Sequence, residues 1–334
     1  MGGISAGSGA ASAGAASNVG IGREVMMNAT SAYDNVAIGS LAGLDMTSAH
    51  SNTLVGYMAG TNITDGDSNV AIGKDALKSV TTTDDNVAIG ERAGSGNTGG
   101  SNIYIGRLAG AANTSNSYNT VVGTNALKDT DGAGSSSAFG YGAMQYSSAD
   151  NATGIGQYAL SGATGDKNAA LGNSAGAIAK GSTNSVMVGY QAGYHPTGNY
   201  NTWLGYKAGY GVLDSGAYNN VGIGREALLD ITTGYENVAI GNLAGENVTT
   251  ANRNIFIGNG AGSGFTTSAE FNVVIGSGSM SANTQTGNHN VVILGGVNAK
   301  ADLTETTIIG HSAGAGVSGN NCTFIGKSAG SGTN

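Results

Sequence analysis

The sequence predicts an all-β fold: a parallel β-solenoid (a β-roll or β-helix) of about 19 coils, where a coil is one turn of the chain. Three observations lead to this prediction. A unit of 16 to 19 residues recurs along most of the 334 residues, and each unit carries an apolar triplet of the Val-Ala-Ile type. The chain has 60 Gly but one Pro, one Cys and only 10% charged residues. A unit this short cannot bury its own apolar side chains, so neighbouring units must stack.

The triplets are the predicted strands. Asn-Val-Ala-Ile-Gly occurs unchanged at residues 35–39, 69–73, 86–90 and 237–241. With its Gly as position 0, there are 19 copies, and only the copy with Leu294 at position 0, followed by Gly295, lacks the Gly there. Position −1 is a large apolar residue in all 19 copies, and position −3 is Val, Ile or Thr in 17. Apolar residues that alternate about position −2 are typical of a strand.

The rest of each unit predicts a bend and a return. Position +3 is Ala in 16 copies, and position +4 is Gly in 11 and Leu or Met in seven. About eight variable residues follow, rich in Thr, Ser, Gly, Asn and Asp, which favour turns. Each coil is therefore expected to contain a short strand, a Gly bend, a second short segment and a polar return.

Position −4 predicts a ladder of stacked asparagines. It is Asn in 14 copies, and parallel stacking places identical residues above one another, where Asn side chains hydrogen-bond along the stack. The predicted ladder comprises Asn18, Asn35, Asn52, Asn69, Asn86, Asn102, Asn119, Asn168, Asn201, Asn220, Asn237, Asn254, Asn272 and Asn290.

Position −2 is the basis for predicting self-association. It is expected to face away from the coil interior, yet it is apolar or Gly in every copy, and a strand that is apolar on both faces is covered on both. We therefore expect an intertwined or packed homotrimer, with position −2 at its interface. The alternative is a wide single-chain coil that encloses positions −3, −2 and −1. The interface candidates are Leu54, Tyr104, Val121, Met187, Trp203, Phe256, Val274, Val292, Ile308 and Phe324.

The repeats define the domain organisation. They form a β-solenoid repeat domain at residues 18–330, after a Gly/Ala/Ser-rich linker or fragment edge at residues 1–17 and before a tail at residues 331–334. Both ends suggest an excised or processed piece. No stretch of about 18 apolar residues predicts a membrane span.

Composition excludes several classes of protein. Collagen requires Gly at every third residue and abundant Pro, coiled coils require heptads, and disulfide scaffolds require many Cys. The net charge is −8, and the 13 basic residues are spread singly, which argues against a nucleic-acid partner.

Units of the form Asn-Val-Ala-Ile-Gly-x-x-Ala-Gly, from Asn18 to Gly330, resemble the repeats of phage tail-fibre and related virion adhesins. They are also similar to the head repeats of trimeric autotransporter adhesins of bacteria, which are usually shorter. The resemblance implies a homotrimeric parallel β-solenoid in a virion tail fibre or at a cell surface. No coiled-coil stalk or membrane anchor of the autotransporter kind is visible in the sequence.

The sequence predicts neither an enzyme nor a cofactor or metal site. His50, His195, His289 and His311 fall at different repeat phases, and Cys322 occupies the Asn position without a recurring His or acid beside it. The acidic turns at residues 65–67, 84–85 and 129–132 do not continue into a calcium loop with Glu at its twelfth position.

One aromatic belt suggests a contact with a glycan or a neighbouring fibre part, because aromatic rings suit sugar rings and protein partners. The alternative is that its tyrosines at position +1 continue a surface ladder with Tyr57 and Tyr141. The belt, near the only Pro (Pro196), comprises Tyr190, Tyr194, His195, Tyr200, Tyr206, Tyr210 and Tyr218.

The expected function is a structural fibre module, a rigid trimeric rod that spaces or presents host-receptor attachment. Its partners would be other copies of itself, fibre or virion proteins at its ends, and a cell-surface glycan or receptor. One alternative is a bacterial adhesin head that binds host matrix or glycans. Another is an ice-binding solenoid, which needs one Thr-rich position facing solvent, whereas Thr here occurs mostly at position −3 and in irregular returns; the position −3 residues are Thr53, Thr120, Thr153, Thr202, Thr307 and Thr323.

Overall fold

A computed structural model describes residues 17–129, 133–195, 197–212, 216–281, 286–293, 303–315, 317 and 320–331. The chain divides into two units, Met1–Gly162 and Ala163–Asn334. Several sequence predictions lie outside the described residues: most of the N-terminal linker (residues 1–16), residues 130–132 of one acidic turn, Pro196, Leu294 with Gly295, and residues 332–334 of the tail.

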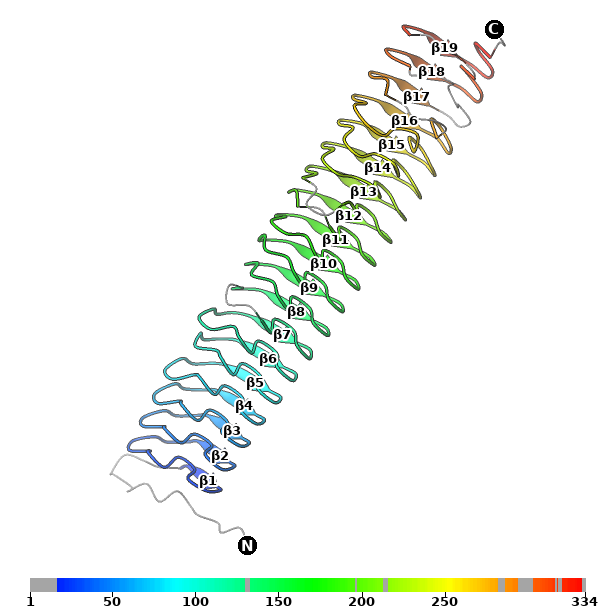
Figure 1. Cartoon of the computed structure of the whole chain (residues 1–334). Helices are drawn as coiled ribbons and strands as arrows, with labels where there is room; N and C mark the ends of the chain where they lie inside the picture. Colours follow the sequence, from blue (N-terminus) through cyan, green and yellow to red (C-terminus); the bar gives the residue numbers. More distant parts are fainter. Residues whose placement is uncertain are drawn as a thin grey trace. The chain divides into compact units, whose positions relative to one another are not determined.

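The structure is an all-β parallel β-solenoid, and the described residues contain no helix. In each unit successive coils stack, and each coil contributes one three-residue strand (Figure 1). The first unit contains β1 (Val19–Ile21), β2 (Val36–Ile38), β3 (Thr53–Val55), β4 (Val70–Ile72), β5 (Val87–Ile89), β6 (Ile103–Ile105), β7 (Thr120–Val122), β8 (Ser137–Phe139) and β9 (Thr153–Ile155). The second contains β10 (Ala169–Leu171), β11 (Val186–Val188), β12 (Thr202–Leu204), β13 (Val221–Ile223), β14 (Val238–Ile240), β15 (Ile255–Ile257), β16 (Val273–Ile275), β17 (Val291–Ile293), β18 (Thr307–Ile309) and β19 (Thr323–Ile325).

The strands of each unit pair in parallel with the repeat in register. Val70 pairs with Val87 and Ile72 with Ile89, so position −3 lies beside position −3 and position −1 beside position −1. The same register joins Val238 to Ile255 in the second unit. Insertions in the returns change the length of a coil but not this alignment, because each extra residue lies outside the strand.

The glycine at position 0 turns the chain at the end of each strand. At Gly90 φ is +136°, a conformation that residues with a Cβ rarely adopt, and a Cβ there would lie 2.6 Å from the carbonyl oxygen of Gly106. The backbone continues to pair after the bend, since Arg92 N donates to Lys74 O at 2.8 Å. The predicted order of strand, bend, second segment and return is confirmed.

The asparagine ladder is confirmed in both units. Asn237 donates its Nδ2 to Asn220 Oδ1 at 3.1 Å and to the carbonyl of Ala251 at 2.8 Å. Its own Oδ1 accepts the backbone N–H of Asn254 at 3.0 Å. The ladder residues are at most 1% exposed, apart from Asn18 in the first coil. Each ladder oxygen therefore satisfies a backbone N–H of the next coil inside the protein, whereas the buried Nδ2 of Asn119 has no hydrogen-bond partner among the described residues.

The predicted orientation of position −2 is wrong. These side chains point into the coil of their own chain, so they are not accessible to a partner chain. Nine of the ten interface candidates are at most 1% exposed, namely Leu54, Tyr104, Val121, Met187, Trp203, Phe256, Val274, Val292 and Ile308; Phe324, in the last coil, is half-buried.

The core is narrow, and positions −2 and +4 share it. A Cβ on Gly110 would lie 2.1 Å from the Tyr104 ring, and a Cβ on Gly209 would lie 2.2 Å from the Trp203 ring. Where position −2 is small, as at Gly222, position +4 carries the large buried side chain, here Leu228. In such coils one large and one small residue share the core; where both positions are small, as at Ala37 and Gly43, other side chains such as Met46 and Leu54 fill the space.

Candidate interaction surfaces

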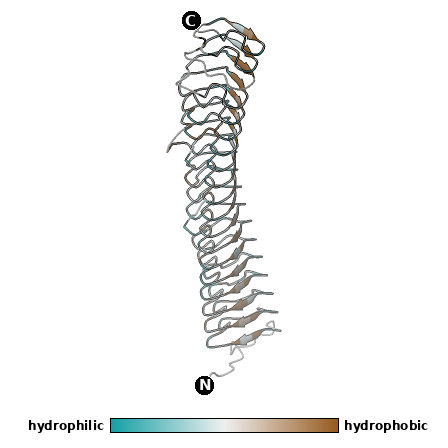
Figure 2. Cartoon of the chain, turned by 90° about the vertical axis from the view of Figure 1, so that its right-hand side faces the viewer, coloured by the Kyte–Doolittle hydropathy of each residue, from teal (hydrophilic) through white to brown (hydrophobic). Residues whose placement is uncertain are grey.

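Positions −3 and −1 form the outward face of the strands. In each unit Figure 2 shows the apolar strands, coloured brown, in one row along one side of the coils. Ile72 and Ile89 are 37% and 38% exposed, and Leu171 and Leu204 are 49% and 44% exposed. We call this surface, made of positions −3 and −1 of successive coils, the outward strand face. The wide coil that would enclose all three strand positions is therefore not formed.

The aromatic belt of the second unit is a set of stacked rings. The rings of Tyr190 and Tyr206 lie 5.4 Å apart at 13°, and those of Tyr194 and Tyr210 lie 5.4 Å apart at 5°. His195 contacts Tyr194 and Tyr210 edge-on at 4.6 and 5.1 Å. Stacking covers one face of each ring, and Tyr190 and Tyr206 remain 45% and 43% exposed. The stack of Tyr190 on Tyr206, both at position +1, fits the ladder interpretation over these two coils, while Tyr141 contacts Tyr158 instead.

Burial lowers the pKa of His195 within this belt. Tyr200 and Tyr218, the other members, belong to different stacks or stand apart: Tyr200 is 60% exposed, whereas Tyr218 stacks on Tyr235 at 4.9 Å and 2°. The seven residues predicted as one belt therefore do not form one continuous surface cluster.

A second ladder, which the sequence analysis missed, precedes β13 to β17. It contains Tyr218, Tyr235, Arg253, Phe271 and His289. The Arg253 guanidinium lies 5.0 Å from the Tyr235 ring and 5.2 Å from the Phe271 ring, and Phe271 stacks on His289 at 5.1 Å. Their spacing of 17 or 18 residues, one coil each, was the signal that could have revealed them.

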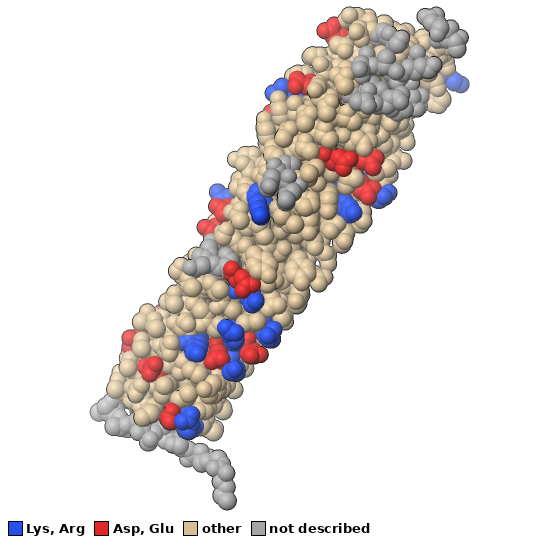
Figure 3. All heavy atoms as spheres, viewed as in Figure 1, with Lys and Arg blue, Asp and Glu red and all other residues tan. Residues whose placement is uncertain are grey.

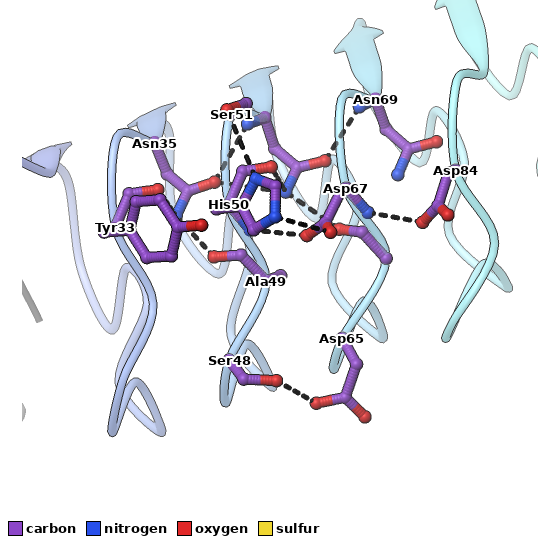
Figure 4. Close-up of polar contacts among 12 residues, drawn as sticks. Tyr33, Asn35, Ser48, Ala49, His50, Ser51, Asp65, Asp67, Asn69 and Asp84 are labelled. Atoms are coloured by element: carbon purple, nitrogen blue, oxygen red, sulfur yellow. Dashed lines mark hydrogen bonds and ion pairs between the residues drawn. The ribbon is translucent and has the colours of Figure 1, made fainter. Parts of the chain in front are cut away.

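A polar cluster surrounds His50 in the first unit (Figure 4). His50 Nε2 lies 2.7 Å from Asp67 Oδ2, and the Tyr33 ring stacks on the imidazole at 4.7 Å. Ser48 and Thr47 donate to Asp65, and these two hydrogen bonds hold the pKa of Asp65 below its ordinary value.

The serine–histidine–carboxylate order in this cluster invites comparison with a hydrolytic triad. Ser51 Oγ lies 3.3 Å from His50 Nδ1, a long contact between sequence neighbours on an exposed surface. Asp67 Oδ1 also accepts the backbone N–H of His50 at 2.8 Å, and Asp67 N in turn donates to Asp84 at 2.8 Å.

The same backbone contact recurs where no histidine is present. Asn252 Oδ1 accepts the N–H of Tyr235 at 3.0 Å, and Asn199 Oδ1 accepts that of Thr183 at 2.9 Å. The side chain at position −6 thus ties one coil to the preceding one. The geometry around His50 is that of a structural link between coils with an added imidazole–carboxylate contact.

The remaining reactive side chains lie apart from one another. His311 is exposed beside Ser312, at 3.1 Å between Nδ1 and Oγ, and the half-buried Cys322 contacts the carbonyl of Asn320 at 3.3 Å. Within the described ranges no three His, Cys, Asp or Glu side chains gather in a way that could hold a metal ion.

A shallow groove of about 600 Å³ crosses the coils of β4, β5 and β6 in the first unit. Charged side chains and small residues line it, among them Lys74, Lys78 and Arg92. The sequence analysis treated these basic residues as spread singly, because Lys78 follows Lys74 by 4 residues and Arg92 follows Lys78 by 14. Stacking of the coils brings them together, and Figure 3 shows a cluster of basic and acidic side chains on this unit.

In the part of the chain that the structure describes, no helix is long and apolar enough to cross a membrane. No protein-family model matches the chain, and no curated protein matches its sequence.

Proposed function

We propose that the chain is a structural fibre module of a virion tail fibre or surface appendage. In this proposal three copies associate into a rigid rod that spaces or presents host-receptor attachment. The proposal assigns the chain no catalytic role.

The outward strand face is the observation that carries the proposal. Monomeric soluble proteins rarely expose a large contiguous apolar patch, and such patches mark interaction sites. Here Ile, Val and Leu side chains of successive coils lie beside one another in register, and those at position −1 are often more than a third exposed, as at Ile72 and Ile89. Position −3 is mostly less exposed and is Thr in six coils. Other copies of the same chain offer an identical face of matching length and chemistry. The interface is therefore assigned to positions −3 and −1, and the threefold symmetry rests on the resemblance to trimeric fibre repeats.

The mass of the native particle tests the association. A homotrimer of the 32.7 kDa chain is expected at about 98 kDa by light scattering coupled to size exclusion. Ile89→Glu places a charge on the outward strand face once per copy, so three charges meet in the trimer. We expect this variant to elute as monomers, because an unpaired buried charge costs several kcal/mol.

Thr82→Glu is the matched control, since it adds the same charge to an exposed return residue of the same coil. It should leave the particle mass unchanged, and circular dichroism should show that both variants keep the β-solenoid. A wild-type particle of 32.7 kDa, or an Ile89→Glu variant that stays trimeric, would contradict the proposed interface.

Two alternatives are distinguished by other measurements. A bacterial adhesin head would bind host matrix proteins or glycans directly, which immobilised matrix protein and a glycan array would reveal. An ice-binding solenoid gains some support from the outward position of Thr53 and Thr120, which are half-exposed on the strand face. Thermal hysteresis of the isolated chain would favour that function over a fibre module.

A further inference from the structure

We propose that the groove across the coils of β4, β5 and β6 binds an acidic polysaccharide through Lys74, Lys78, Arg92 and Arg107. This proposal rests on the proposed function, because it names the class of ligand that one surface of the fibre module would bind. We call this surface the basic groove; it is lined by Lys74, Asp75, Lys78, Ser79, Glu91, Arg92, Ser95, Gly96 and Ala111.

Cations outnumber carboxylates in and beside the basic groove. Lys74 and Lys78 share one carboxylate, that of Asp75, with each Nζ 3.8 Å from it. Arg107 lies 3.6 Å from Glu91. Among the ion pairs of the described residues none includes Arg92, whose side chain is exposed at the groove. Four cations therefore face two carboxylates, on a chain whose net charge is −8.

The groove is hollow because two successive coils carry small residues. Position +5 holds Ser95 and Ala111 here, whereas the same position holds Tyr194 and Tyr210 in the second unit. Lys78 occupies position +5 of the preceding coil and closes one end of this depression. A sugar ring can therefore enter the depression over Ser95 and Ala111, where the basic side chains around it can contact the ring's acidic groups.

The lining chemistry fits an acidic sugar chain. Arg and Lys donate charge-assisted hydrogen bonds to carboxylate or sulfate groups, and the hydroxyls of Ser79 and Ser95 can bond to sugar hydroxyls. The basic residues come from three coils spaced about 4.8 Å apart, so several groups of one extended chain can be contacted at once. The lining includes no aromatic ring on which a base could stack, which disfavours a single-stranded nucleic acid.

Binding of defined polymers to the full chain tests the proposal. Polygalacturonate supplies carboxylates, dextran sulfate supplies sulfates, and neutral dextran and a single-stranded oligonucleotide serve as comparisons. Wild-type protein should bind at least one of the two acidic polysaccharides and not neutral dextran, and affinity should fall as salt is raised from about 50 to 300 mM.

Arg92→Ala and Lys78→Ala should each weaken this binding roughly fivefold, because an exposed ion pair contributes up to about 1 kcal/mol. The double variant should weaken it roughly 20-fold at low salt. Lys180→Ala is the matched control, an exposed lysine of the second unit outside the groove, and should bind like the wild type.

A preference for polygalacturonate or for dextran sulfate identifies the anionic group that the groove takes. Unchanged binding in the double variant, no binding of either polymer, or tighter binding of the oligonucleotide would overturn the proposal. The particle mass of the same samples tests the fibre proposal independently. A trimer that binds no polysaccharide would contradict only the groove proposal, and a monomer that binds polysaccharide would contradict only the fibre proposal.

Discussion

The buried asparagines at position −4 link each coil to both of its neighbours. Each ladder oxygen accepts a backbone N–H of the following coil, and in Asn237 the Nδ2 also donates to the preceding ladder residue and to a return carbonyl, so this amide closes hydrogen bonds of three coils. Ser185 shows what the position requires, since its hydroxyl accepts the N–H of Asn201 at 3.1 Å. The essential group is an acceptor, and the amide N–H adds a contact to the return.

Asn237→Ala should destabilise the solenoid by about 2–3 kcal/mol, because it leaves the N–H of Asn254 and the carbonyl of Ala251 buried without partners. Asn237→Ser should cost less, about 1 kcal/mol, because the hydroxyl keeps an acceptor there. Urea unfolding followed by circular dichroism, at one fixed protein concentration, measures both.

Asn242→Ala is the control for this prediction. Asn242 is not buried, and it donates to Asn259 at 2.9 Å on the surface, so its loss should change stability by less than about 0.5 kcal/mol. Equal effects of the Asn237 and Asn242 substitutions would show that the ladder does not stabilise the fold.

At the scale of one coil, the pair of positions −2 and +4 determines the packing. Trp203 lies over Gly209, and Tyr104 lies over Gly110, where a side chain would overlap the ring. Burial also raises the pKa of the Tyr104 hydroxyl, to which Asn113 Nδ2 donates at 3.0 Å. The largest side chains at position −2, such as Trp203 and Tyr104, therefore require Gly at position +4 of the same coil, because a Cβ there would overlap the ring.

Trp203→Ala should cost about 3–5 kcal/mol, since it leaves a cavity in a core only one or two side chains wide. Gly209→Leu alone should also destabilise, because its Cβ would lie 2.2 Å from the indole. The double variant reproduces the natural pair Ala71 and Leu77, so it should be more stable than the sum of the single effects predicts, by about 1–3 kcal/mol.

Thermal unfolding of the four proteins, in a double-mutant cycle, measures this coupling. Leu77 itself adopts φ of +48°, so the positive φ at position +4 does not exclude leucine. Additive single effects would contradict the inward packing of position −2.

Two carboxylates beside the segments that follow β13 and β14 make stability depend on pH. Burial raises the pKa of Asp230, and burial followed by repulsion from Glu226 and Asp230 raises the pKa of Glu246. A folded-state pKa above the unfolded value means that the folded state binds protons more tightly. This contribution to stability is present at low pH and is lost as the pH rises through the folded-state pKa.

Glu246→Gln should therefore raise the melting temperature at pH 7 by roughly 1–2 °C and have less effect near pH 4, where the carboxyl is mostly protonated in both states. Melting curves at the two pH values test this. Glu305→Gln, at an exposed residue of the same unit, is the control, and a similar shift in both variants would rule out the local cause.

At the scale of the whole molecule, both units present the same outward strand face and the same inward ladder. The outward strand face consists mostly of Ile, Val, Leu and Thr, and the charged side chains lie in the segments after the bend and in the returns. This distribution supports association through the strands and leaves the other surfaces, including the basic groove, for other ligands. The mass of the particle and the polysaccharide assay address these two surfaces separately.

Much of the fold follows from the sequence. The strands lie at the predicted triplets, the glycine bends follow them, and the asparagines stack as expected. This success has a physical reason: in-register parallel stacking makes every contact between coils a contact between equivalent positions, so the repeat itself specifies the pairing. The surface clusters were harder to predict, because Lys78, Arg92 and Arg107 occupy different positions after the bend, and the repeat alone does not say which way each side chain points.

The sequence by itself determined the period, the strands, the bends and the Asn ladder. Only the tertiary structure decided which face of the strand lies inside, because alternation does not distinguish two faces that are both apolar. The decision depends on the direction of the glycine bend, which carries the Ala at position +3 and the residue at position +4 over position −2. The complementary sizes of Trp203 and Gly209, and of Gly222 and Leu228, are the signal in the sequence that position −2 faces the interior.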